Sequence, residues 1–480
     1  MSSLKKNFGY QIAYRVLTVI TPLITSPIVY RALGADNLGI YSATQAFANY
    51  FMFLAMLGIE TYGQRTIAAA SNKEKRQKLF WEIYSVQAVA STISIIFYIF
   101  AVAIFGGDRT CIMYIQGFWI LSCLLNIGWF FFGLEDFKVT VTRSFAIKLI
   151  TVICVVLFIR KPEHLILYAI IMACGTTISE LLLWFSLFRR IKYIKPSWIE
   201  IKSHIIPIFR LFIPVIALSV YHIMDKSMLD LLSTEANVGW YYAVDKIVYI
   251  PLGLITAIST VMLTRVSYVI NNESRNRIYD LLKKSSELTM FLTCAVSFGI
   301  AAISKEFIPF FFGPGYEPCV KLMYCFLPVL LIKAIGDVVR TQFLIPSKRD
   351  NLYTIAVICG AFTNVLFNLL LIPLFGALGA VFGTLASEFV VLMVQVFGCI
   401  KEVNFVSIFS KQLFYLLLGA LMMLIVRLFA NTVVIQYQIV KLLCMIGIGA
   451  VSYLLLCSSI WLFKKDSIFY RDFQRLFFRR

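Results

Sequence analysis

Long apolar stretches recur along the whole of this 480-residue chain, and short polar segments separate them. An α-helix that crosses about 30 Å of hydrocarbon needs about 20 mostly apolar residues. The pattern therefore predicts an all-α polytopic membrane protein with about 14 transmembrane helices. The predicted spans are Phe8–Val29, Leu38–Ile59, Phe80–Phe105, Cys111–Gly133, Phe145–Ile159, Leu165–Phe188, Leu211–Leu232, Gly239–Leu263, Leu288–Ile303, Val320–Leu344, Leu352–Ile372, Ala377–Ile400, Leu413–Ala430 and Val440–Phe463.

Composition excludes a soluble protein. Apolar residues make up 60% of the chain and charged residues 14%, with a mean hydropathy of +0.84. Soluble domains have about 45–50% apolar and about 25% charged residues, and a water-exposed surface cannot hold this apolar surplus. Because the segments between spans are short, there is no room for a soluble catalytic domain, and we expect a protein that is not an enzyme.

The chain carries 44 Lys and Arg against 25 Asp and Glu, a formal net charge of +19. No basic stretch forms a domain of its own, which argues against nucleic-acid binding. With the N-terminus inside, the predicted cytoplasmic segments hold 30 of the basic residues and the outer loops hold 5. This positive-inside bias predicts that both termini are cytoplasmic.

The cysteine and histidine residues do not indicate a metal-binding site. The 11 Cys are scattered through apolar runs without a C-x-x-C pair, and only 3 His are present. They are typical of small buried side chains rather than disulfides or metal ligands. No phosphate-binding G-x-x-x-x-G-K-[ST] loop occurs, so we expect neither a metal nor another cofactor.

A local repeat appears when the sequence is shifted by 200 residues. Residues 37–43 (NLGIYSA) align with 237–243 (NVGWYYA), and six crossings separate the copies, so both share one orientation. This predicts a parallel repeat of two six-helix lobes, an arrangement that transporters use. The predicted segments are the first lobe with its basic linker at 1–205, the second lobe at 206–405, two further spans at 406–463, and a basic amphipathic cytoplasmic tail at 464–480.

Charged side chains within the spans are the candidate functional residues. Such groups cost about 2.5–3.5 kcal/mol at membrane depth, so each needs an ion partner or a water-filled cavity. Because Lys and Arg occur in spans of both lobes, we predict a cationic cavity that binds an anionic group such as phosphate. The predicted substrate-binding residues are Arg15, Lys148, Lys226, Lys246, Lys333 and Arg340, and the candidates for proton or sodium coupling are Asp225, Asp245 and Glu388.

Ion pairs between or along helices are the alternative explanation for these residues. Lys226 and Asp230 are four residues apart and, with the adjacent Asp225, could neutralise one another. Helical spacing places Lys333, Asp337 and Arg340 along one face. For Arg427, late in the thirteenth span, the ion-pair explanation is favoured over a functional one.

Several motifs resemble bacterial polysaccharide-biosynthesis flippases (Wzx-like proteins). They are YRALG at 30–34 with GIY at 39–41, AMLGI at 55–59 with YGQR at 62–65, WFFFGLE at 129–135, DK at 225–226 with GWY at 239–241, and FLIPSK at 343–348 with IPLFG at 372–376. The resemblance covers residues 5 to about 400. It implies membership of the multidrug/oligosaccharidyl-lipid/polysaccharide exporter superfamily, with two six-helix lobes in a V shape.

The resemblance also implies a function. It is the transfer of an undecaprenyl-pyrophosphate-linked oligosaccharide from the inner to the outer leaflet of a bacterial cell membrane, for assembly of O-antigen, capsule or exopolysaccharide. Membrane lipids are then partners, and polysaccharide polymerase and chain-length proteins are candidate partners. Two alternatives stay open: an ion-coupled multidrug antiporter of the same superfamily, and a membrane-embedded polymerase or glycosyltransferase. An antiporter favours an acidic cavity, and a membrane enzyme needs a long loop with an acidic metal-binding motif.

Overall fold

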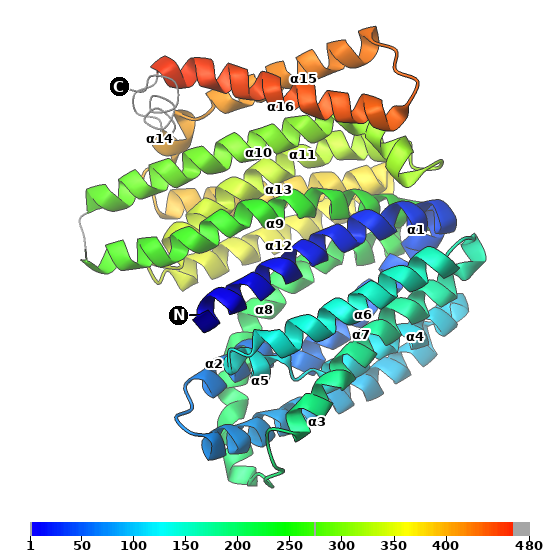
Figure 1. The fold of residues 1–480 in the computed structure, drawn as a ribbon, viewed down its shortest axis with the longest axis vertical. Coiled ribbons are helices and arrows are strands. Elements are labelled where there is room, and N and C mark those ends of the chain that lie inside the picture. The colour runs from blue at the N-terminus through cyan, green and yellow to red at the C-terminus, as the bar shows by residue number, and fades with distance from the viewer. Residues whose placement is uncertain (1, 273–274, 464–480) are drawn as a thin grey trace. The chain divides into compact units, whose positions relative to one another are not determined.

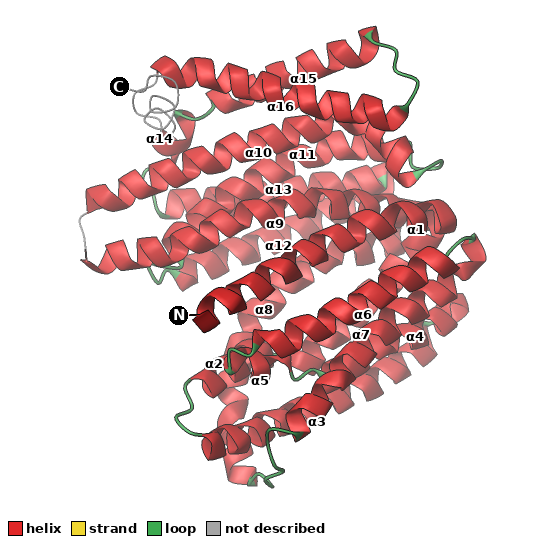
Figure 2. Ribbon diagram, viewed as in Figure 1, coloured by secondary structure: helices red, strands yellow, loops and turns green. Residues whose placement is uncertain are grey.

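Helices and loops make up residues 2–272 and 275–463, which are the residues that the computed structural model describes (Figure 2). Side chains are not described at 2–19, 213–222, 254, 261, 264, 271–272 and 275–276. The predicted amphipathic tail at 464–480 lies outside the described residues. Within them, 11 helices are long and apolar enough to cross a membrane, which confirms a multi-pass all-α membrane protein. The other three predicted spans fall in the helices α1 and α8, and the total of fourteen crossings stays a prediction.

The chain divides into two compact units, Met1–Gly239 and Trp240–Arg480. Colours from blue to green mark the first unit in Figure 1. Its elements are α1 (Ser2–Met56), α2 (Ile59–Ala68), α3 (Lys73–Phe105), η1 (Gly107–Arg109), α4 (Thr110–Leu125), α5 (Gly128–Gly133), α6 (Phe137–Phe158), η2 (Pro162–His164), α7 (Leu165–Phe188), α8 (Trp198–Leu232) and the start of α9 (Glu235–Asn272).

The second unit contains the rest of α9 and the elements that follow it. These are α10 (Arg275–Phe312), α11 (Pro318–Val339), the π-helical turn η3 (Arg340–Leu344), α12 (Asp350–Phe375), α13 (Ala377–Gly398), α14 (Phe405–Ser410), α15 (Phe414–Thr432) and α16 (Gln438–Phe463). Helices α12 and α13 pack along each other, and α11 packs against α13 and α10. The boundaries of the predicted lobes stay a prediction.

Helix α1 contains the first two predicted spans and changes direction at Gly34. The helix runs through Pro22 and Pro27, but Gly34 has φ 77° and ψ 173°, which is outside the helical region. Glycine adopts this left-handed φ without the steric cost that a Cβ imposes. The glycine therefore separates the two spans without an intervening loop.

The two copies of the repeat contact each other within the first unit. A Cβ added to Gly39 would overlap the carbonyl of Glu235, and a Cβ added to Gly239 would overlap the carbonyl of Ala35. A shift of 200 in residue number turns the Gly39–Glu235 contact into the Gly239–Ala35 contact. Each of these close approaches leaves no room for a side chain, which explains why both positions have glycine.

Arg109 links η1 to the turn between α8 and α9. Its Nη1 donates to Asp230 Oδ1 at 2.6 Å, and its Nη2 donates to Glu235 Oε1 at 2.7 Å. At the same end of the unit, Asn37 Nδ2 donates to the carbonyl of Pro162 in η2 at 3.2 Å. Predicted outer loops thus meet at one end of the first unit.

Gln87 on α3 holds the break between α4 and α5. Its Nε2 donates to the carbonyls of Cys123 and Asn126, each at 2.7 Å, and its Oε1 accepts from Trp129 Nε1 at 2.9 Å. The carbonyls at the C-terminus of an interrupted helix lack their regular i+4 donors, and Gln87 supplies hydrogen bonds to two of them. The WFFFGLE motif therefore begins at a structural junction in the core.

Large apolar side chains cover the outer faces of the helices. Phe97 on α3 and Phe185 on α7 are each 63% exposed, and Phe362 on α12 is 71% exposed. Exposing such apolar faces to water is unfavourable in free energy, whereas contact with lipid tails is not. These faces are therefore suited to the bilayer.

Candidate functional site

Three helices of the second unit bring predicted site residues together. Lys333 on α11 donates to Glu388 Oε1 on α13 at 2.7 Å and to Tyr249 Oη on α9 at 2.7 Å. The side chains of Lys333 and Glu388 are only 9% and 12% exposed. A residue predicted to bind substrate and one predicted to couple an ion thus form one buried ion pair, although Glu388 lies 55 residues from Lys333 in sequence.

A second ion pair lies about two turns further along α11. Arg340 Nη2 donates to Asp337 Oδ1 at 2.5 Å, and Thr341 Oγ1 donates to the same oxygen at 2.8 Å. The carboxylate side chain is 4% exposed, while the guanidinium side is 35% exposed. Arg340 also begins the π-helical turn η3, a type of irregularity that is frequent at functional sites. Helical spacing predicted Asp337 and Arg340 on one helix face, and the structure shows the two side chains in contact.

Helix α9 carries the other two candidates of this unit. The Lys246 ammonium lies 4.3 Å from the centre of the Tyr242 ring, a cation–π contact. Asp245 precedes Tyr249 by one helical turn and acts electrostatically on it, as do Lys333 and Glu388. Basic and acidic groups are therefore interspersed in this part of the second unit.

In the first unit, the candidates are spread over three helices. Asp225 on α8 is 4% exposed, and its neighbour Ser227 lies 3.2 Å from Tyr50 Oη on α1. Lys226 on α8 and Lys148 on α6 are half-buried. The side chain of Arg15, in α1, lies outside the described residues. The predicted single cavity formed by all these cations stays a prediction.

Arg427 on α15 lies in an ion pair, as predicted. Its Nη1 donates to Glu306 Oε2 on α10 at 2.7 Å, and its Nη2 donates to Tyr324 Oη at 3.1 Å. Both side chains of the pair are less than one fifth exposed. This pair resembles the Lys333–Glu388 pair in burial and in its tyrosine partner.

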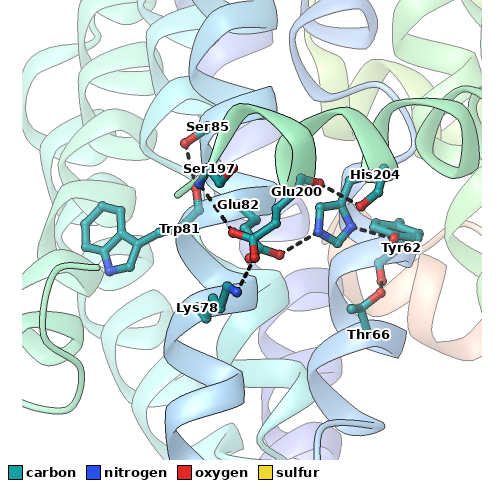
Figure 3. A network of polar contacts seen from close by, with 10 residues as sticks. Tyr62, Thr66, Lys78, Trp81, Glu82, Ser85, Ser197, Glu200 and His204 are labelled. Carbon is teal, nitrogen blue, oxygen red and sulfur yellow. Dashed lines mark hydrogen bonds and ion pairs between the residues drawn. The ribbon is translucent and has the colours of Figure 1, made fainter. Parts of the chain in front are cut away.

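A buried network that the sequence analysis missed joins α2, α3 and α8. His204 Nε2 lies 2.8 Å from Glu82 Oε2, and His204 Nδ1 lies 2.7 Å from Tyr62 Oη. Figure 3 shows the imidazole between the carboxylate and the phenol, with the Lys78–Glu200 ion pair beside it. The hydrogen bond from Lys78 lowers the pKa of the Glu200 carboxyl below its ordinary value. No sequence signal pointed to this network, because its members are far apart along the chain.

Metal binding has no support in the part of the chain that the structure describes. Nowhere among those residues do three His, Cys, Asp or Glu side chains lie close enough to hold an ion. The chemistry available to the described candidates is therefore ionic pairing and hydrogen bonding.

Solved structures with the same fold are transporters. The structure resembles lipid II flippase MurJ in an inward closed conformation, with a TM-score of 0.73 over 97% of this chain and 99% of that chain, at 16% identity. It also resembles a multidrug resistance MATE family transporter of the MOP superfamily in an inward-facing conformation, with a TM-score of 0.61 over 83% and 95% of the chains, at 11% identity. At these identities the likeness shows the fold alone.

Sequence comparison defines the family. A candidate O-antigen transporter of Escherichia coli (strain K12) is 22% identical over 80% of this chain and 94% of its own length. The profile of the lipid II flippase MurJ family matches residues 141–449. The profile of the polysaccharide biosynthesis protein family matches residues 4–267, which is more than half of the chain. The chain therefore belongs to the polysaccharide biosynthesis protein family, the Wzx-like flippases of the multidrug/oligosaccharidyl-lipid/polysaccharide exporter superfamily.

Proposed function

We propose that this protein moves an undecaprenyl-pyrophosphate-linked oligosaccharide from the cytoplasmic to the outer leaflet of a bacterial cell membrane. The product would serve surface polysaccharide assembly, with a polymerase and chain-length proteins as partners. Both termini would lie in the cytoplasm. The observation that carries the proposal is the set of cations, Lys333, Arg340 and Lys246, within helices that are apolar and long enough to cross a membrane, in a chain of this family.

Ionic chemistry explains how such a set would act on the substrate. The two phosphates lose their hydration when the head group enters the membrane, and this loss is the main barrier to crossing. Guanidinium and ammonium groups replace that hydration, Arg through bidentate hydrogen bonds and Lys as a point charge. The polyprenyl tail would stay in lipid while two lobes rock and expose the head group on alternate sides.

Deletion of the gene in its host tests the proposal. We expect the lipid-linked oligosaccharide to accumulate on the cytoplasmic side, and a plasmid copy of the gene to restore export. Single Ala variants of Arg15, Lys226, Lys246 and Arg340 should reproduce the accumulation, whereas Lys284→Ala, which removes an exposed surface ion pair, should not. Normal export by all four variants would refute the cationic cavity. Transport of a cationic dye without any change in the lipid-linked intermediate would instead favour an antiporter.

A further inference from the structure

The Lys333–Glu388 pair is a closed ionic contact in the second unit. The ammonium has a carboxylate and a phenol at 2.7 Å, and little of either charged side chain is exposed. Such a pair persists because each charge compensates the burial of the other. An anion can therefore bind Lys333 strongly only if it takes the place of the Glu388 carboxylate.

When an anion displaces the Glu388 carboxylate from Lys333, the charge of Glu388 is no longer compensated by that ammonium. A buried carboxylate that loses its cation is costly in a medium of low dielectric constant, and it becomes neutral by taking up a proton. The Lys333 ammonium keeps its proton throughout, while its ionic contact to Glu388 breaks and its contact to the anion forms. One proton from the aqueous phase then binds Glu388, so the negative charge that the anion brings is offset by the one that Glu388 loses. The charged and titratable groups around the pair are Asp245 and Tyr249 on α9, Asp337 on α11, Arg340 at the start of η3, and Tyr353 on α12. Arg340 already pairs with Asp337 and is therefore engaged when the anion displaces Glu388 from Lys333.

Building on the proposed function, we propose that Lys333 and Glu388 form a displaceable ion pair that couples substrate binding to proton uptake. The diphosphate of the substrate replaces the Glu388 carboxylate on Lys333, and Glu388 binds one proton as it is released. When the diphosphate leaves, the proton leaves with it and the pair re-forms. The pair is thus both the anion site and the coupling site.

The pH dependence of affinity tests this exchange. The probe is undecaprenyl pyrophosphate, titrated into the purified full-length protein in lipid nanodiscs between about pH 6 and about pH 8. Uptake of one proton on binding makes the affinity of the wild type fall by about tenfold for each pH unit beyond any change that the probe itself causes. Glu388→Gln should remove this additional dependence and bind more tightly at high pH, because Lys333 no longer has a competing carboxylate.

Matched variants control for structural effects. Glu306→Gln removes a carboxylate that is similarly buried and paired with Arg427, and it should keep the wild-type pH dependence. The double variant Lys333→Gln/Glu388→Gln leaves no unpaired charge, so it should fold, bind the probe weakly and lack the additional pH dependence. Wild-type pH dependence in Glu388→Gln, with binding intact, would overturn the exchange and leave the proposed function standing. Failure of the wild type to bind the probe at any pH would overturn the exchange together with the proposed function.

Discussion

Replacing Arg109 tests whether the ion pairs at one end of the first unit hold η1 to the α8–α9 turn. In Arg109→Gln the side chain is shorter and uncharged, so it loses the ionic contacts to Asp230 and Glu235, at 2.6 and 2.7 Å. We expect the variant to fold, because no side chain at this site is fully buried, and to unfold at a lower temperature than the wild type.

The magnitude follows from the exposure of the three groups. Arg109 is 28% exposed and its partners are 26% and 39% exposed, so the pairs are neither fully solvated nor dry. Each contact is then expected to contribute about 0.5–1.5 kcal/mol, which gives about 1–3 kcal/mol for both. For a unit of this size, the middle of that range lowers the melting temperature by about 4–8 °C.

Thermal unfolding of the purified protein in detergent measures this effect. Lys284→Gln is the control, because its pair with Asp280 is half exposed and spaced by 3.4 Å, and it should melt with the wild type. Raising the salt concentration should narrow the difference between the wild type and Arg109→Gln, since screening weakens the pairs. Equal melting temperatures of the two proteins at low salt would refute the stabilising role.

Three further substitutions test the buried contacts. Gln87→Leu should lower the free energy of unfolding by about 2–3 kcal/mol, because the indole N–H of Trp129 and the carbonyl of Asn126 lose their partner; a melting temperature like that of the wild type would contradict this. Gly39→Ala should cost about 1–3 kcal/mol, because its Cβ overlaps a neighbouring carbonyl, whereas Gly253→Ala has open space and should cost nothing. His204→Phe should cost about 3 kcal/mol, because the buried carboxylate beside it loses its partner, and an unchanged unfolding temperature would rule out that role.

Apolar patterning was sufficient to locate the helices, but not their ends. The third span was predicted from Phe80, whereas α3 begins at Lys73. Asn72 caps the helix, since its side chain accepts a hydrogen bond from the backbone of Lys75 at 2.8 Å. Hydropathy describes the part of a helix in lipid, and polar capping extends the helix into the aqueous region.

Breaks within spans depend on distant partners. The fourth predicted span runs through the junction at which α4 ends and α5 begins. Gln87, 36 residues before the Cys123 carbonyl, supplies the hydrogen bonds that make this break possible. A local pattern contains no information on such a bond.

Contacts between distant residues of the candidate site could not be predicted from the sequence either. Helical spacing placed Lys333, Asp337 and Arg340 on one face, without indicating that Asp337 and Arg340 pair with each other. The Asp230 carboxylate accepts from Arg109, 121 residues earlier, a contact that the sequence did not indicate, and the pairing of Lys226 with Asp230 stays a prediction. The Lys333–Glu388 contact joins two helices, so residue types indicated both members without indicating that they meet.

Translocation by the purified protein is the most direct measurement of the central claim. Full-length protein is reconstituted into vesicles that contain an undecaprenyl-pyrophosphate-linked oligosaccharide in both leaflets, and membrane-impermeant periodate oxidises only the sugars exposed outside. The account predicts that the protein makes the inner-leaflet pool accessible over time, while protein-free vesicles keep it protected. An inner-leaflet pool that stays protected in vesicles containing folded protein would contradict it.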